Sequence, residues 1–218
     1  FDVTDLLVDG ENTLAVKVWK WTDGSYLEDA DHWRMAGIHR EVLLLYRPSV
    51  AVNDFAVRTL LDEDYKDARL WIRPAVTVQE GADVNGWKIQ GRLYDASGVL
   101  VAEGMSVAVS AILLEKYPQR DIVHWPLMES VITDPAKWTA ETPYLYTLVL
   151  TLTDAQGSCV EARSCKVGFR DVKIKDQQLL INGVPVKLYG VNRHDHSEFG
   201  GKSISRAEME ADIRLMKQ

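Results

Sequence analysis

The sequence predicts a mainly β protein, in which a β-sandwich is flanked by an incomplete β-segment and by one strand, loop and helix. Residues 50–167 hold about seven short extended runs separated by turn residues, which is typical of a sandwich. The first 47 residues show apolar alternation in too few runs to close a sheet. The last residues carry a helical period. We therefore place domain boundaries at 1–47, 48–169 and 170–218.

The first segment, 1–47, is expected to be the end of a larger β-domain that begins before Phe1. Apolar and other residues alternate over 13–21, which predicts a strand. The apolar run 42–46 predicts a second strand, which Arg47 and Pro48 end. Two strands cannot bury both faces of a sheet, so further strands are expected outside this sequence.

The second segment, 48–169, is expected to form the sandwich. The predicted strands are 50–60, 68–79, 87–94, 99–103, 106–114, 144–153 and 160–167. The turns at 95–98 and 154–157 share the form Asp-Ala-x-Gly, in which Asp caps the turn and Gly accepts a positive φ, so both predict hairpins. Trp138 and Tyr146 are expected to be core anchors rather than platforms for a sugar ring.

The third segment, 170–218, begins with a predicted hairpin. Asn182 and Gly183 are a strong two-residue turn signal between predicted strands over 178–181 and 184–189. Further on, Ser205 and Glu208 form a capping box. The stripe that follows, Met209, Ile213 and Met216, predicts the buried face of a helix. A strand, a loop and a helix with nothing after them indicate the first βα unit of a fold that continues beyond Gln218.

Composition excludes several classes of partner. With 25 basic and 32 acidic residues the net charge is −7, and no Lys/Arg cluster occurs, which argues against nucleic acid or an anionic membrane as partner. No apolar run approaches the roughly 18 residues that span a bilayer, and no leader is recognisable. Cys159 and Cys165 would be roughly 20 Å apart in an extended segment and cannot pair. We expect a cytoplasmic protein, with the periplasm as the alternative.

An acidic loop over 23–38 is the first candidate site. It holds four carboxylates, two aromatic residues and Arg34. Neighbouring carboxylates repel, and a carboxylate held beside Trp33 is costly unless Arg34, a cation or a substrate hydroxyl pairs with it. The alternative is a solvated acidic turn anchored by Trp33.

The sequence from Trp21 to Val42, which contains this loop, closely resembles the end of the sugar-binding domain in the large bacterial β-galactosidases of glycoside hydrolase family 2. Residues 190–196, Gly-Val-Asn-Arg-His-Asp-His, resemble the end of the first strand of that family's catalytic barrel. The intervening sequence also matches at Pro135, Trp138, Pro143, Leu145, Tyr146, 167–170, Asn182 and Gly183.

The resemblance gives each segment an identity. It implies that 1–47 is the tail of a jelly-roll sugar-binding domain and that 48–169 is an immunoglobulin-like β-sandwich. It also implies that 170–218 starts a (β/α)₈ TIM barrel.

The same resemblance implies site residues. Asp31 aligns with an aspartate that accepts hydrogen bonds from galactose hydroxyls and lies beside a sodium ion, and Asp29 is the fallback if the register is shifted. A carboxylate suits this task because it accepts from two vicinal hydroxyls in charge-assisted bonds. His194 aligns with a histidine that stabilises the transition state through a sugar hydroxyl. Both catalytic glutamates and the magnesium ligands of the family lie beyond Gln218, so the isolated chain is expected to be inactive.

The histidine motif differs from the usual galactosidase motif sequence at two positions. Asp195 stands where glutamate is usual, and Ser197 stands where a last histidine is usual. Relatives that act on glucuronides have lysine in place of Arg193, so the motif favours a galactoside and leaves the linkage open. A transition-metal site formed by His194 and His196 with Asp29 or Asp31 is a weaker interpretation, because no third ligand lies within sequence reach.

The expected function is therefore that of a fragment of a retaining β-galactosidase. The parent would hydrolyse terminal non-reducing β-D-galactose in lactose-like substrates, use Na⁺ and Mg²⁺, and form a homo-oligomer as some relatives do. Alternatives are a non-catalytic sandwich module that binds or spaces carbohydrate, or a family 2 β-glucuronidase or β-mannosidase. The sequence that follows Gln218 in the gene distinguishes an enzyme from a module.

Overall fold

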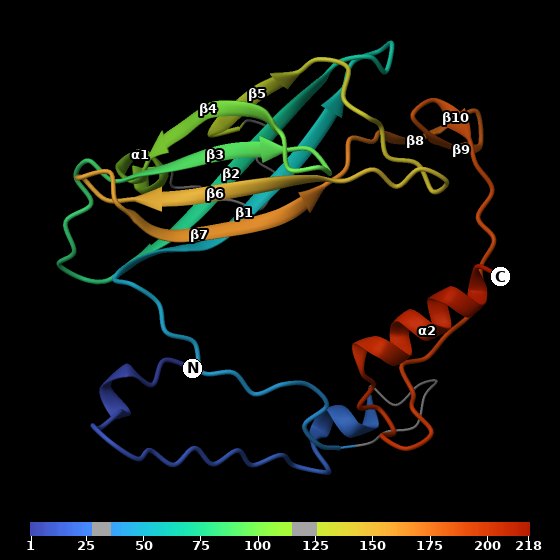
Figure 1. Cartoon of the computed structure of the whole chain (residues 1–218). Helices are drawn as coiled ribbons and strands as arrows, with labels where there is room; N and C mark the ends of the chain where they lie inside the picture. Colours follow the sequence, from blue (N-terminus) through green and yellow to red (C-terminus); the bar gives the residue numbers. More distant parts are fainter. Residues whose placement is uncertain (28–35, 115–125) are drawn as a thin grey trace. The chain divides into compact units, whose positions relative to one another are not determined.

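The computed structural model describes residues 1–27, 36–114 and 126–218. It divides into two compact units, Leu45–Leu188 and the combination of Phe1–Leu44 with Tyr189–Gln218. Figure 1 shows the elements of both units along the chain. The described residues contain no helix long and apolar enough to cross a membrane.

The unit Leu45–Leu188 contains the expected sandwich. One sheet has the strand order β1-β2-β5 and the other has β4-β3-β6-β7, with all neighbours antiparallel (Figure 1). The strands are β1 Val50–Leu61, β2 Ala68–Val78, β3 Lys88–Tyr94, β4 Leu100–Ala108, β5 Met128–Ile132, β6 Tyr146–Thr153 and β7 Cys159–Val167.

A single apolar core fills the space between these two sheets. Leu148, Leu150 and Leu152 on β6 are completely buried, which confirms the alternation read from the sequence. Tyr146 is confirmed as a core anchor, because its ring packs edge-on against Phe169 with the ring centres 5.1 Å apart. Its hydroxyl accepts a hydrogen bond of 2.8 Å from the backbone amide of Ala136, which satisfies the polar end of the ring.

Both predicted Asp-Ala-x-Gly hairpins are present. In the turn between β3 and β4, Asp95 Oδ1 accepts hydrogen bonds from the amides of Ser97 and Val99, at 2.9 and 2.8 Å. Asp154 Oδ1 makes the equivalent bonds between β6 and β7. The two glycines, Gly98 and Gly157, have φ angles of +87° and +83°, which a side chain would strain.

The strand predicted over 106–114 is wrong. Strand β4 runs continuously through Gly104, whose φ of +83° forms a bulge in which Glu103 and Gly104 face Arg92. The chain then turns into the short helix α1, Val109–Leu114, which buries Val109 and Ile112. Strand β5 was not predicted, so the total of seven strands results from two errors that cancel.

A second, small sheet follows the sandwich within the same unit. It has the order β10-β9-β8, with β8 Val172–Lys175, β9 Gln178–Ile181 and β10 Val184–Pro185. The predicted Asn182 and Gly183 turn joins β9 to β10, and both residues have a positive φ. The second strand is shorter than expected, since its ladder ends with a bond from the amide of Val186 to the carbonyl of Leu179.

The N-terminal part of the other unit differs from the expectation. Its described residues form 3₁₀ turns at Thr4–Leu6 and Asp23–Tyr26 and no strand, so the strands predicted over 13–21 and 42–46 are not formed. Leu14, Val16 and Val18 are 68%, 54% and 47% exposed. An extended segment becomes a strand only when a partner binds its amides and carbonyls, and no described residue does this here.

The predicted C-terminal helix is confirmed, but its predicted buried face is wrong, because the helix contains no buried residue and Ile213 and Met216 are 53% and 49% exposed. Helix α2, Arg206–Met216, begins with the predicted capping box, in which Ser205 Oγ accepts from the amide of Glu208 and Glu208 Oε2 accepts from the amide of Ser205. Residues 187–196, which include the histidine motif, form no strand.

Candidate functional site

The two aspartates predicted from the acidic loop, Asp29 and Asp31, lie outside the described residues. The turn that leads into the loop is described. There Ser25 is buried, and its Oγ accepts a hydrogen bond of 2.8 Å from the amide of Thr22. Arg40 is the described residue on the far side of the loop that contacts the histidine motif.

The histidine motif is linked to α2 through Arg193. The guanidinium of Arg193 donates from Nε to Oδ2 of Asp212 at 2.8 Å, and its Nη2 lies 2.7 Å from the same oxygen. Its Nη1 donates to Oδ1 of Asp195, two residues further along the motif. One planar cation therefore holds two carboxylates, which is an arrangement that the rigid fork of arginine favours.

Asp195 links the motif to the segment after the acidic loop. Its Oδ2 lies 3.3 Å from Nη2 of Arg40, which is 155 residues earlier in the sequence. Nη1 of Arg40 also donates to the carbonyls of His39 and Lys202, at 2.9 and 3.4 Å. The described segment after the predicted aspartate loop thus contacts the predicted histidine motif through Arg40.

Ser197 links the end of the motif to the start of α2. It is 7% exposed, and its backbone forms a bridge with Gly201. Its Oγ accepts from the amide of Gly200 at 3.2 Å. Its hydroxyl also bonds Glu208, and together with the amide and hydroxyl of Ser205 it lowers the pKa of Glu208 to about 2. A small hydroxyl fits this buried position, which explains locally why serine stands there.

Three residues of the motif region, Arg193, Asp195 and Ser197, are anchored by the contacts described above. His194 and His196, at the intervening positions, are both exposed. An exposed imidazole both donates and accepts hydrogen bonds, so it can recognise a sugar hydroxyl.

The described residues contain no group of three or more His, Cys, Asp or Glu side chains that could hold a metal ion. His194 and His196 therefore gain no third ligand there, as a tetrahedral site would need. Sequence reasoning missed the anchoring roles of Asp212, Arg40 and Ser197. The capping-box signal identified Glu208, but only as a partner of Ser205.

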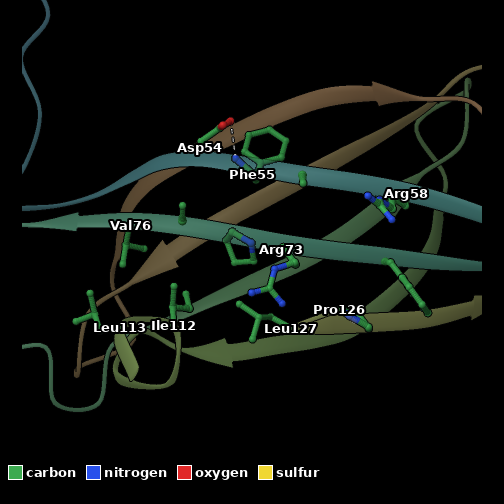
Figure 2. Close-up of a pocket in the computed structure, with 13 residues that line it drawn as sticks. Asp54, Phe55, Arg58, Arg73, Val76, Ile112, Leu113, Pro126 and Leu127 are labelled. Atoms are coloured by element: carbon green, nitrogen blue, oxygen red, sulfur yellow. Dashed lines mark hydrogen bonds between the residues drawn. The ribbon is translucent and has the colours of Figure 1, made fainter. Parts of the chain in front are cut away.

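A pocket in the sandwich unit contains none of the predicted site residues. It is lined by residues of β1 and β2 together with Ile112, Leu113, Pro126 and Leu127, and has a volume of about 640 Å³ (Figure 2). Arg58, Trp71 and Arg73 contribute its polar groups, and the buried Nε1 of Trp71 has no hydrogen-bond partner among the described residues. Figure 2 labels Ile112, Leu113 and Leu127 among its apolar lining residues. Its described lining residues include one carboxylate, Asp54, and so do not supply the pair that glycoside hydrolysis requires.

Comparison with known families covers almost the whole chain. Residues 1–48 match the sugar-binding domain of glycosyl hydrolases family 2, residues 50–170 match the domain named glycosyl hydrolases family 2, and residues 172–218 match the TIM barrel domain of the same family.

The chain is also similar to proteins named beta-galactosidase. It is 43% identical to one from Priestia megaterium over 219 residues and 39% identical to one from Pseudoalteromonas haloplanktis over 218 residues. Each match covers 100% of this chain and 20% of the relative, so the chain spans about a fifth of the length of the curated relatives it matches.

Among solved structures, the chain resembles a β-glucuronidase from Ruminococcus gnavus in complex with D-glucaro 1,5-lactone. The TM-score is 0.59 at 24% identity, over 78% of this chain and 24% of that one. The apo structure of the enzyme gives a TM-score of 0.58. At this identity the likeness concerns the fold alone.

Proposed function

We propose that this chain, which belongs to glycoside hydrolase family 2, is a segment of a retaining β-galactosidase that hydrolyses terminal non-reducing β-D-galactose residues. The observation that carries this proposal is the 43% identity, over the whole chain, to a protein named beta-galactosidase. The solved β-glucuronidases share only the fold at 23–24% identity and do not alter the substrate assignment.

In this proposal the chain supplies sugar-binding groups rather than the reacting carboxylates. A retaining glycosidase needs two carboxyl groups about 5–5.5 Å apart, one as nucleophile and one as acid and base. Both glutamates would lie in the longer polypeptide, outside this chain. Asp31 would accept hydrogen bonds from galactose hydroxyls, and His194 would bond a hydroxyl more strongly in the transition state than in the ground state.

The proposed organisation assigns 1–47 to the sugar-binding domain, 48–169 to the immunoglobulin-like sandwich and 170–218 to the start of the barrel. Na⁺ beside Asp31 and Mg²⁺ bound by residues elsewhere in the longer polypeptide remain proposals. Carboxylate oxygens suit such hard cations. A homo-oligomer in the cytoplasm is proposed as well, and the free thiols of Cys159 and Cys165 on β7 are compatible with a reducing compartment.

The test is hydrolysis of a chromogenic β-galactoside by the complete product of the gene that contains this sequence. We expect cleavage by the unaltered protein. Asp31→Ala and His194→Ala should each lower kcat/KM by roughly a hundredfold or more, as removal of a transition-state hydrogen bond does elsewhere. Glu103→Ala, on an exposed part of β4, is the matched control and should leave the rate unchanged. An unaltered protein that cleaves no β-galactoside would refute the proposal.

A further inference from the structure

Four side chains of alternating charge form a continuous chain around the histidine motif: Arg40, Asp195, Arg193 and Asp212. They come from three separate parts of the sequence, namely the segment after the acidic loop, the motif itself and helix α2. Each of the two central groups has an oppositely charged partner on both sides. The charges are therefore mutually compensated without any additional ion.

The exposure of these groups indicates that their main contribution is geometric. The side chains of Arg40, Asp195 and Asp212 are 58%, 45% and 45% exposed, whereas Arg193 is 24% exposed. Exposed ion pairs add little to the stability of a fold, because water screens them and long side chains lose entropy when they pair. A network, in contrast, restricts the orientation of the segment that carries it.

We propose that Arg193 and Asp195 are positioning residues that hold the His194 imidazole toward the sugar, and that Arg40 extends this constraint to the described segment 36–44. The inference rests on the proposed function, since it gives His194 a sugar to face. Because residues 193, 195 and 197 are held by contacts before and after His194, the position of the His194 backbone is restricted.

Such a constraint matters because catalytic contacts tolerate little displacement. A misplacement of about 1 Å can cost roughly a hundredfold in rate. The planar guanidinium of Arg193 holds the carboxylates of Asp195 and Asp212 in fixed relative directions, which a lysine ammonium cannot do. Loss of this fork should therefore affect His194 even though Arg193 does not touch the substrate.

The kinetic test uses the complete gene product with a chromogenic β-galactoside. Arg193→Gln and Asp195→Asn should lower kcat by roughly ten- to a hundredfold with a smaller change in KM, because His194 acts mainly in the transition state. Asp195→Glu keeps the charge and should retain most of the rate. Glu210→Gln breaks an exposed ion pair with Arg206 on the same helix, away from the motif, and should have no effect.

A second measurement does not depend on activity. Amide hydrogen exchange should speed up in 190–197 and in 36–44 together when Arg40→Gln or Asp195→Asn is introduced, and in neither segment for Glu210→Gln. Wild-type cleavage, with unchanged kcat in the Arg193 and Asp195 variants and unchanged exchange in the Arg40 and Asp195 variants, would overturn the inference while leaving the proposed function intact. A wild-type protein that is inert toward the galactoside would instead refute the proposed function, and exchange confined to one segment would refute the coupling.

Discussion

The carboxylate of Glu161 on β7 accepts a hydrogen bond of 2.7 Å from the backbone amide of Val52 on β1. These strands are edges of different sheets, so the bond joins the two layers of the sandwich. Val52 is 2% exposed and precedes a bulge at which β1 shifts its register against β2. Arg163 pairs with the other oxygen of Glu161 and balances its charge. A side chain here replaces the missing partner of an edge-strand amide.

Glu161→Ala should therefore destabilise the sandwich. It leaves the amide of Val52 buried without an acceptor, which costs about 1–3 kcal/mol. Urea unfolding followed by tryptophan fluorescence measures the loss. The matched change Glu103→Ala, on an exposed pair whose atoms are 4.0 Å apart, should stay within about 0.5 kcal/mol of the wild type. Equal effects of the two changes would show that the Glu161 bond has no special role.

Leu150→Ala tests the core between the sheets. Leu150 is completely buried on β6, so its truncation should remove about 2–5 kcal/mol through lost apolar burial and a residual cavity. Leu114→Ala removes the same atoms from a residue that is 81% exposed and should change the unfolding free energy by less than about 0.5 kcal/mol. Similar losses at both positions would contradict the described core.

Gly183→Ala tests the contact between the β9–β10 turn and the β1–β2 hairpin. A Cβ on Gly183 would lie 2.7 Å from Cε2 of Tyr65, and the residue has a φ of +78°. We expect a loss of roughly 1–2 kcal/mol from backbone strain and about 1–3 kcal/mol more from overpacking. Gly98→Ala has a similar φ and open space around it, so it should show the strain alone. Identical losses would indicate that Tyr65 yields freely.

Glu208 gives a prediction for pH. Hydrogen bonds from Ser197 and Ser205 lower its pKa from 4.5 to about 2. Because the folded value lies below the unfolded one, the carboxylate stabilises the start of α2 fully above pH 4.5 and loses this effect as the pH falls toward 2. Titration of the Glu208 carboxyl by NMR should show a midpoint well below 4.5, and Ser197→Ala should raise it. A midpoint near 4.5 in the wild type would contradict the described bonds.

Most of the sandwich was predictable because apolar residues alternate with other residues along a strand that has one buried face. Leu148, Leu150 and Leu152 are the clearest case. Prediction of strands failed where the same local pattern is compatible with two different structures. The pattern predicts two strands, 99–103 and 106–114, where the single strand β4 continues through a bulge at Gly104. Residues 13–21 have the pattern of a strand but lack a pairing partner among the described residues, and pairing cannot be deduced from a segment's own alternation.

The site was predictable in its residue types and not in its anchors. The resemblance of the histidine motif identified His194 as a site residue. The resemblance of the acidic loop identified Asp31, which lies outside the described residues. Nothing in the local pattern links Arg40 to Asp195 across 155 residues, or Arg193 to Asp212. Such contacts depend on tertiary packing, because they join α2, the motif and the segment after the acidic loop, which are separate in the sequence.

The substrate preference of the complete gene product is measured as the ratio of kcat/KM for a β-galactoside to that for the matched β-glucuronide. We expect the galactoside to be preferred by roughly a hundredfold or more, because a site built for neutral hydroxyls leaves a uronate charge without a partner. An equal rate on both substrates, or a preference for the glucuronide, would refute the assignment as a β-galactosidase.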